Sequence, residues 1–325
     1  MIKTCVLVTP GNFVKSKAGL AILRGRYDIL LPENLNVPKE ERQRVVAIVL
    51  ADQPITSLDM DIFPNLKTIA RTGTGYDNVD LKAAGERGIV VTRVSALNAP
   101  AVSEYALALI FALARNVVST HEQLVHEKKW ERSQGYMLAD LTIGIVGVGT
   151  VGRALARKLQ ALGVKKLLGY DRPEVEEELR KNGEFKIDFP GDLKKLARES
   201  DVIVAAVELN DQTRGIISRE ILFLMKPTAF LVNVARGALV DEEALAEAIE
   251  AGRIGGAALD VYSTEPPLDQ PFFQKLAKLQ GKHNIILTPH MATTVKNLFE
   301  EISAKVAQNV IAVLDGKLEG LEIVN

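Results

Sequence analysis

The chain contains little cysteine, almost no net charge and no long apolar run. Its single cysteine, Cys5, cannot form an internal disulfide, which fits a reducing, cytoplasmic setting. Cys5 stands in an apolar run, and since unpaired cysteine is commonly buried, we expect it to be a core residue rather than a reactive thiol. A formal net charge of −1 at pH 7 indicates no preference for nucleic acid or anionic lipid.

Signals for membranes and secretion are also missing. The longest apolar stretch, residues 105–114, has about half the length that a membrane-spanning helix requires. The first residues have the pattern of a strand, and no cleavable apolar segment follows them, so we expect no signal peptide. The sequence therefore predicts a soluble, cytoplasmic protein.

Short apolar runs alternate with helical patterns along the whole chain, which has 325 residues and is 47% hydrophobic. A first set of runs covers residues 5–8, 45–50, 68–70 and 89–92. A second set covers residues 143–148, 166–170, 202–207, 230–234, 256–259 and 285–288. Because these runs lack polar alternation, helices should cover both faces of each sheet. We predict the α/β class, with two doubly wound parallel-sheet domains.

The segments between and after the two sets suggest how the domains are divided. A helical stretch rich in Ala and Leu begins near Ala99, and a polar segment at 127–140 holds the only tryptophan, Trp130. The helical pattern at 294–314 is long enough to pass back to the first domain. We therefore predict one domain from residues 1–98 and 294–325, and another from residues 99–293.

A dinucleotide-binding fingerprint follows the strand pattern at 143–148. Gly147, Gly149 and Gly152 form a GxGxxG motif that runs into the helical pattern at 153–162. These glycines would permit the tight turn, the approach of a pyrophosphate and close helix–strand packing, and the helix N-terminus would bind the phosphates. A lone motif of this kind is weak evidence, because glycines also serve ordinary turns.

The fingerprint gains support from Asp171, which ends the next strand, 19 positions after Gly152 (171 − 152). A carboxylate there accepts hydrogen bonds from the ribose 2′-hydroxyl and repels a 2′-phosphate, which favours NAD over NADP. The adjacent Arg172 works against that preference. The simpler alternative is a strand-end Asp that only starts a turn.

Three charged side chains follow strands of the second set, at the strand ends where open α/β sheets bind ligands. They are Arg236, Glu265 and His290. Reduction of a 2-keto acid needs a cation for the carboxylate and carbonyl, which suits Arg236, and a proton donor, which suits His290. A carboxylate such as Glu265 would hold the ring and favour its protonated form.

Each of these three residues has a plainer interpretation by itself. Arg236 could pair with a surface acid, Glu265 could be solvated, and an isolated His290 would more often be structural. Only four histidines are present, and polar surroundings predict that the other three are exposed, namely His121, His126 and His283. The joint arrangement after a dinucleotide-binding fold favours catalysis.

Several motifs, in this order along nearly the whole chain, resemble the D-isomer-specific 2-hydroxyacid dehydrogenase family. They are the segment 71–80 (RTGTGYDNVD), the segment 98–104, the glycine fingerprint and Thr288-Pro289-His290. The resemblance implies a flavodoxin-like substrate domain built from both chain ends and a central Rossmann NAD domain, with the active site in the cleft. It further implies a homodimer joined largely through the NAD domains.

The resemblance also implies a reaction and a set of site residues. NADH would pass a hydride to C2 of a small 2-keto acid, giving a D-2-hydroxy acid, while Arg236 orients the substrate and protonated His290, held by Glu265, donates to the oxygen. Backbone N–H groups of Gly73, Thr74 and Gly75 would bind the substrate carboxylate, and no metal is implied. Besides the three fingerprint glycines, the positions expected to contact NAD are Thr150, Val151, Asp171, Val207, Thr213, Val234, Ala235 and Asp260.

Departures from the family pattern bear on the substrate. Many phosphoglycerate dehydrogenases carry Arg-Ser-x-Thr near positions 50–54, where this chain has Leu-Ala-Asp-Gln-Pro. The missing cation and the added Asp52 weaken the case for a phosphorylated substrate, and the chain stops at Asn325 without a serine-sensing domain. Glu208 stands where the family often has proline, beside the adenine site.

Four alternatives remain at this stage. A short-type 3-phosphoglycerate dehydrogenase is the leading one, because residues 73–80 closely resemble those enzymes. Formate dehydrogenases usually have Gln at the position of Glu265. A corepressor of the C-terminal-binding-protein type, acting as an NAD-sensing scaffold, would usually carry a disordered tail that is missing here. An inactive NAD-binding protein would not need an intact Arg–Glu–His set.

Overall fold

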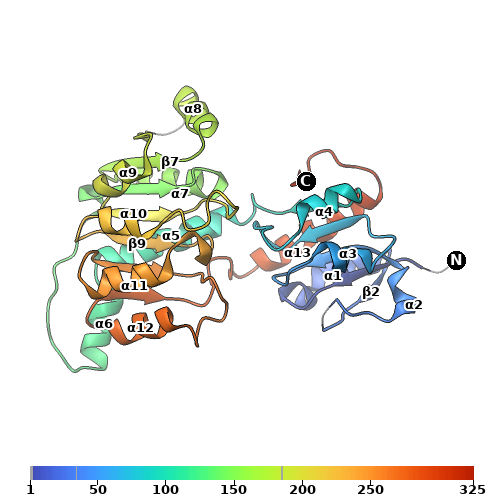
Figure 1. Cartoon of the computed structure of the whole chain (residues 1–325), viewed down its shortest axis with the longest axis horizontal. Coiled ribbons are helices and arrows are strands. Elements are labelled where there is room, and N and C mark those ends of the chain that lie inside the picture. The colour runs from blue at the N-terminus through green and yellow to red at the C-terminus, as the bar shows by residue number, and fades with distance from the viewer. Residues whose placement is uncertain (1–2, 34, 184–185) are drawn as a thin grey trace. The chain divides into compact units, whose positions relative to one another are not determined.

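A computed structural model describes residues 3–33, 35–183 and 186–325. The chain forms two compact units (Figure 1). Unit 1 consists of Met1–Asn98 with Thr293–Asn325, and unit 2 consists of Ala99–Ala292. The return to unit 1 thus begins at Thr293, one residue before the boundary expected from the sequence.

Unit 1 is built on a six-stranded sheet. Its parallel strands are β1 (Cys5–Val8), β2 (Asp28–Leu30), β3 (Val45–Leu50), β4 (Thr68–Arg71) and β5 (Val90–Arg93). Strand β12 (Glu322–Ile323) pairs antiparallel with β5 at one edge. The order β2-β1-β3-β4-β5 is that of the flavodoxin-like doubly wound fold. The predicted fold class is confirmed for this unit.

Helices cover both faces of this sheet, because strand side chains alternate between two apolar clusters. In β1, Cys5 and Leu7 pack into one cluster, while Val6 and Val8 pack into the other with α1 and α13. Burial raises the pKa of the Cys5 thiol to about 11, as expected for a core cysteine. The helices are η1 (Asn12–Lys15), α1 (Lys17–Arg24), α2 (Lys39–Arg42), α3 (Ser57–Asp61), α4 (Leu81–Glu86) and α13 (Leu298–Leu314).

Unit 2 contains a second six-stranded sheet, in which every strand is parallel. Its strands are β6 (Thr142–Val146), β7 (Lys166–Tyr170), β8 (Val202–Ala205), β9 (Phe230–Asn233), β10 (Gly256–Leu259) and β11 (Asn284–Leu287). The order is β7-β6-β8-β9-β10-β11. A parallel bridge between Leu168 and Asp188 adds a segment beyond β7. Along the chain this segment comes third, after β6 and β7, and in the sheet it lies next to β7. The sheet order 3-2-1-4-5-6, counted in this way, is that of the Rossmann fold, and β11 extends it at the other edge.

The helices of unit 2 also lie on both faces of its sheet (Figure 1). In β8, Ile203 and Ala205 pack into one apolar cluster, and Val202 and Val204 pack into the other. The helices are α5 (Ala99–Ala114), α6 (Val117–Val125), η2 (Leu138–Asp140), α7 (Thr150–Ala161), α8 (Pro173–Asn182), α9 (Leu193–Glu199), α10 (Arg219–Leu224), η3 (Gly237–Leu239), α11 (Glu242–Glu250) and α12 (Pro271–Leu279).

All ten predicted strands are present, although several ends move by one or two residues. The run predicted at 143–148 is strand only at Thr142–Val146, because Gly147 turns the chain with φ +96°. Strands β2 and β12 were not predicted, since each has only two or three residues and neither is fully buried. Among the described residues, no single helix is long and apolar enough to cross a membrane, and only α5 and α6 together, bent by 57°, meet that test.

Candidate active site

His290 and Glu265 form a hydrogen-bonded pair at the carboxyl edge of the sheet of unit 2. Nδ1 of His290 lies 2.8 Å from Oε2 of Glu265. The other carboxylate oxygen accepts the backbone N–H of Tyr262 at 3.0 Å, which fixes the orientation of the carboxylate. Both side chains are about four-tenths exposed, so the ring is held on one side and open on the other.

The two groups shift each other's protonation. The hydrogen bond that Nδ1–H donates to Glu265 raises the pKa of His290, against the opposing effects of burial and of the nearby Arg236. Burial disfavours ionisation of Glu265, but the hydrogen bond and charge of His290 outweigh it and lower the pKa of this carboxyl. The pair therefore favours an imidazolium whose Nδ1–H is bound to Glu265, which leaves Nε2–H available to a substrate.

The segment that carries His290 is anchored by Asp260, whose side chain is fully buried. The Asp260 carboxylate accepts the Thr288 hydroxyl at 2.7 Å and the backbone N–H groups of Met291 and Ala292 at 2.8 and 2.9 Å. The backbone N–H of His290 donates to the Asp260 carbonyl at 2.8 Å. These bonds hold His290 in a left-handed backbone conformation, φ +54°.

Asp260 was singled out in the sequence only as a position expected to contact NAD. Its role in holding the His290 segment could not be inferred there, because the partners are 28 to 32 residues away in the chain. The only local signal was a carboxylate in an otherwise apolar strand end. Its contact with NAD stays a prediction.

Arg236 follows β9, the neighbour of β10 in the sheet. The side chain of Asn233 accepts the N–H of Ala235 at 3.1 Å and donates to the carbonyl of Arg236 at 2.9 Å, which shapes this turn. A Cβ on Gly237 would lie 1.9 Å from the backbone of Tyr262, so glycine is required for this close approach. The positive charge of Arg236 is near enough to disfavour protonation of both His290 and Glu265, although Glu265 keeps the pKa of His290 raised. The structure thus brings together the three residues that the sequence proposed.

The glycine fingerprint lies between β6 and α7. A Cβ on Gly147 would lie 2.3 Å from the backbone of Val207, and one on Gly152 would lie 2.1 Å from the carbonyl oxygen of Gly147. In contrast, nothing lies within 4 Å of a Cβ built on Gly149, the N-cap of α7. Thr150 and Val151 form the first turn of this helix, so its free N–H groups border open space, as a pyrophosphate requires.

The remaining residues expected to contact the cofactor lie around the same edge. Asp171 follows β7 and accepts the backbone N–H of Val148 at 2.6 Å. The hydroxyl of Thr213 donates to the carbonyl of Glu208 at 2.6 Å, and this bond closes a turn after β8. Glu208 thus contributes its backbone carbonyl to the turn. Val234 and Ala235 directly follow β9.

The Gly73-Thr74-Gly75 loop belongs to unit 1, after β4. The carbonyl of Gly73 accepts the N–H of Val94 at 3.3 Å, and the carbonyl of Gly75 accepts Nε of Arg71 at 2.7 Å. Within the described part of the chain, the N–H groups of Gly73, Thr74 and Gly75 have no protein acceptor. Successive free N–H groups in a loop suit an anion such as a carboxylate.

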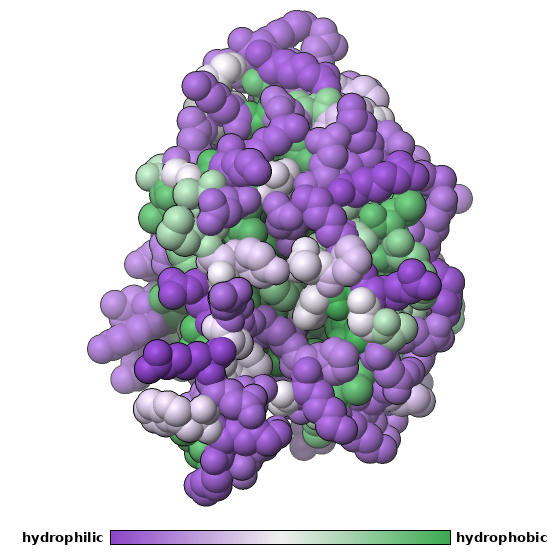
Figure 2. Space-filling view, turned by 90° about the vertical axis from the view of Figure 1, so that its left-hand side faces the viewer, coloured by the Kyte–Doolittle hydropathy of each residue, from purple (hydrophilic) through white to green (hydrophobic). Residues whose placement is uncertain are grey.

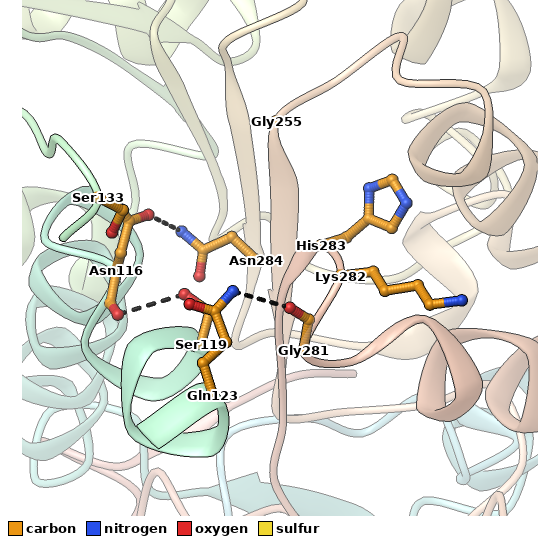
Figure 3. A pocket seen from close by; sticks show the side chains of 9 residues that line it. All are labelled: Asn116, Ser119, Gln123, Ser133, Gly255, Gly281, Lys282, His283 and Asn284. Atoms are coloured by element: carbon orange, nitrogen blue, oxygen red, sulfur yellow. Dashed lines mark hydrogen bonds between the residues drawn. The ribbon is translucent and has the colours of Figure 1, made fainter. Parts of the chain in front are cut away.

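A polar pocket of about 220 Å³ lies at the opposite, amino-terminal edge of the same sheet, beside the start of β11 (Figure 3). There the buried Asn284 donates to the carbonyl of Leu113 and to the side chain of Asn116. None of the residues proposed for catalysis, cofactor binding or substrate binding lines this pocket. Among the described residues, no group of three or more His, Cys, Asp or Glu side chains could hold a metal ion.

Comparison with known proteins gives a consistent picture. The family model for the D-isomer specific 2-hydroxyacid dehydrogenase, NAD binding domain, matches residues 107–292. A glyoxylate reductase of Thermococcus kodakarensis is 34% identical over 318 residues, which cover 92% of this chain and 91% of that protein.

Solved structures extend the similarity to the whole chain. An NADPH-dependent glyoxylate/hydroxypyruvate reductase from Sinorhizobium meliloti, in complex with NADP and malonate, superposes with a TM-score of 0.86 at 26% identity, covering 99% of this chain and 97% of that one. A D-lactate dehydrogenase from Aquifex aeolicus, complexed with NAD and lactic acid, superposes with a TM-score of 0.83 at 28% identity, covering 97% and 96%.

Proposed function

The chain belongs to the D-isomer specific 2-hydroxyacid dehydrogenase family, and from this premise we propose that it interconverts a small 2-keto acid and its D-2-hydroxy acid with NAD as cofactor. It is an oxidoreductase acting on the CH–OH group of its donor. The observation that carries this proposal is the His290–Glu265 pair beside Arg236, at the sheet edge that also carries the glycine fingerprint.

The residues present fit a dinucleotide. Gly147 and Gly152 allow backbone contacts too close for any side chain, and the open space at Gly149 leaves room for a pyrophosphate. Thr150 and Val151 offer the N–H groups of the first turn of α7, and the Asp171 carboxylate lies beside the loop for the ribose hydroxyls. Bound NADH would supply the hydride.

The side chains of the site perform the remaining chemistry. Arg236 orients the substrate carboxylate and polarises the keto oxygen with its fixed charge. His290 donates its Nε2 proton to that oxygen as the hydride arrives at C2, and Glu265 stabilises the imidazolium before the transfer. Oxidation of the hydroxy acid needs the neutral ring, which then accepts the proton.

Asp171 is the basis for preferring NAD to NADP, because its negative charge repels a 2′-phosphate. The similar proteins do not decide this point, since one solved relative is NADPH-dependent and another is complexed with NAD.

A small, unphosphorylated keto acid such as glyoxylate is the favoured substrate. Asp52, in the loop after β3, is exposed and adds negative charge where phosphoglycerate dehydrogenases often have a cation. The similar Thermococcus kodakarensis protein is a glyoxylate reductase. The short-type phosphoglycerate dehydrogenase is the second candidate, because it shares the loop motif at residues 73–80.

A homodimer formed through unit 2 is part of the same proposal. Large apolar side chains are exposed along one stretch of this unit, with Trp130 80% exposed. They are Phe111, Val117, Leu124, Val125, Trp130, Tyr136 and Met137. Figure 2 shows hydrophobic patches among the mostly hydrophilic surface on one side of unit 2. A second copy of the chain would remove such groups from water.

The lone, buried Cys5 supports a reducing, cytoplasmic location.

A panel of keto acids with NADH tests the function. We expect the highest kcat/KM with glyoxylate or hydroxypyruvate, a lower value with pyruvate and a much lower one with phosphohydroxypyruvate. Preference for phosphohydroxypyruvate would support the phosphoglycerate dehydrogenase instead. Poor turnover of all four, with tight NADH binding, would support an NAD-sensing scaffold.

Sedimentation of the purified chain as a monomer at micromolar concentration would contradict the dimer.

A further inference from the structure

The peptide of Val148, in the middle of the glycine fingerprint, is held from both sides. Its N–H donates to Oδ2 of Asp171 at 2.6 Å, and its carbonyl accepts Nε of Arg153 at 3.1 Å. The side chain of Val148 is fully buried, so water is poorly placed to replace either bond. This one residue therefore connects the phosphate loop to the end of β7 and to the first turns of α7.

Arg153 is in turn bound to α8. Its Nη1 and Nη2 donate to the two carboxylate oxygens of Glu178 at 2.9 and 3.1 Å, a bidentate arrangement that fixes the plane of the guanidinium. The hydrogen bond from Arg153 also lowers the pKa of Glu178, so the pair stays ionised at neutral pH. Helix α8 begins at Pro173, two residues after Asp171.

Backbone contacts hold the two ends of the loop, at Gly147 and at Gly149, where the carbonyl accepts the N–H of Arg153 at 2.9 Å. The N–H of Gly147 donates to the carbonyl of Tyr170 at 2.8 Å, which fixes the start of the turn. At Gly149 no atom lies within 4 Å of a built Cβ, so no side chain packs against the loop there. Between these two points, Asp171 and Arg153 bind the backbone of Val148.

We propose that Arg153 and Glu178 are positioning residues for the cofactor, and that Asp171 has a second role as an anchor of the phosphate loop. This inference rests on the proposed binding of NAD. Arg153 and Glu178 act through the Val148 peptide, setting the direction of the free N–H groups at Gly149 and Thr150. Asp171 couples ribose recognition to phosphate recognition, because a single carboxylate binds the loop and faces the ribose.

The carboxylate of Asp171 has room for both roles. A carboxylate accepts about four hydrogen bonds. Oδ2 accepts the N–H of Val148 and Oδ1 accepts the N–H of Arg172, which leaves one further position on each oxygen for the ribose hydroxyls. Removing this side chain would leave the Val148 N–H buried without this acceptor, which would weaken the order of the phosphate loop. Because NADH and NADPH share the pyrophosphate, both would then bind more weakly.

The test of the first part compares Glu178→Gln with the matched control Glu177→Gln. Glu177 is the neighbouring residue on α8, and its ion pair with Lys181 stays within the helix. We expect Glu178→Gln to raise the Kd for NADH about 2- to 5-fold, as loss of one charged, partly exposed pair implies. The kcat, the KM for the keto acid and the melting temperature should stay near wild type, and Glu177→Gln should match wild type throughout.

Equal Kd values in the two variants would overturn this role. A Glu178→Gln variant with reduced kcat and melting temperature but unchanged NADH affinity would also overturn it, because the pair would then be merely structural. Arg153→Lys keeps the charge without the bidentate bond, and it should have an intermediate Kd. If the wild-type chain does not bind NADH, the proposed function and this inference both fail. If it binds NADH and the Glu178→Gln variant binds it equally well, only this inference fails.

The anchor role of Asp171 is tested by Asp171→Asn against Asp171→Ala. Asparagine keeps an oxygen that can accept the Val148 N–H, whereas alanine keeps none. We expect both variants to lose discrimination against NADPH, and the alanine variant to bind NADPH about 5- to 20-fold more weakly than the asparagine variant. NADPH affinity in the alanine variant equal to or higher than in the asparagine variant would show that Asp171 does not support the loop.

Discussion

Replacement of His290 by glutamine is the most direct perturbation of the site. Glutamine keeps a polar side chain of similar reach and can still donate to Glu265, but it cannot transfer a proton to the substrate. General acid catalysis by a positioned side chain contributes about 10²- to 10⁴-fold. We therefore expect kcat for keto acid reduction to fall by about that factor, which corresponds to roughly 2.7 to 5.5 kcal/mol of transition-state stabilisation.

The cofactor should be bound almost normally by this variant. The glycine fingerprint and Asp171 are held by bonds that do not involve His290, as the contacts of Val148 show. The assay is the initial rate of NADH consumption with glyoxylate, together with a fluorescence titration of NADH. A turnover near the wild-type value, with normal NADH affinity, would refute the role of His290 as the proton donor.

The pH dependence provides a second check on the same reasoning. Because Glu265 raises the pKa of His290, the wild-type reduction rate should be full at low pH and should fall as pH rises through that raised pKa. The oxidation rate should change in the opposite sense, since the reverse step needs the neutral ring. The residual activity of His290→Gln should lack this titration, and an identical profile in the variant would assign the titration to another group.

Three further perturbations have defined outcomes. Glu265→Gln should lower the pKa of His290, so the fall in reduction rate should move to lower pH, and an unmoved profile in initial-rate measurements would exclude the coupling. Asp260→Asn replaces one of two buried acceptor oxygens by an NH2 group facing N–H or O–H donors, and it should destabilise the fold by about 1–3 kcal/mol while lowering kcat, as measured by urea unfolding and steady-state rates. An Asp260→Asn variant with wild-type stability would contradict this account of the His290 segment. Cys5, buried and with its pKa raised to about 11, should react with a maleimide only after unfolding, and rapid labelling of the native protein would disprove its burial.

Two carboxylates in this site have different tasks because their surroundings differ. Glu265 is partly exposed and faces the imidazole, so its charge favours the protonated ring. Asp260 is fully buried and faces backbone N–H groups and a hydroxyl, so its charge holds a segment in place. Neither role follows from the residue type, which explains why the sequence could assign a role to Glu265 only through its family resemblance and its place after a strand.

Much of the fold followed from the sequence alone, because the relevant forces act over short distances along the chain. Apolar runs such as Val45–Leu50 must be buried on both faces, and this predicted parallel sheets covered by helices. Gly147 and Gly152 require backbone geometry that only glycine permits, so the nucleotide site was recognisable as a local motif. The placement of Arg236, Glu265 and His290 after strands was also visible, since parallel strands end at a common edge.

Tertiary structure alone decided the features that depend on partners distant in the sequence. The bonds from Asp260 to the His290 segment span about 30 residues, and the bond from Val148 to Asp171 spans 23. In the Gly73–Gly75 loop, Val94 and Arg71 bind the carbonyls of Gly73 and Gly75, which could not be inferred from the motif alone. Hydrogen bonds are directional and short-ranged, so their partners are determined only when the packed core has placed the strand ends side by side. The sequence by itself determined which chemical groups are available at this edge, and the packing of the core decided which of them bind one another.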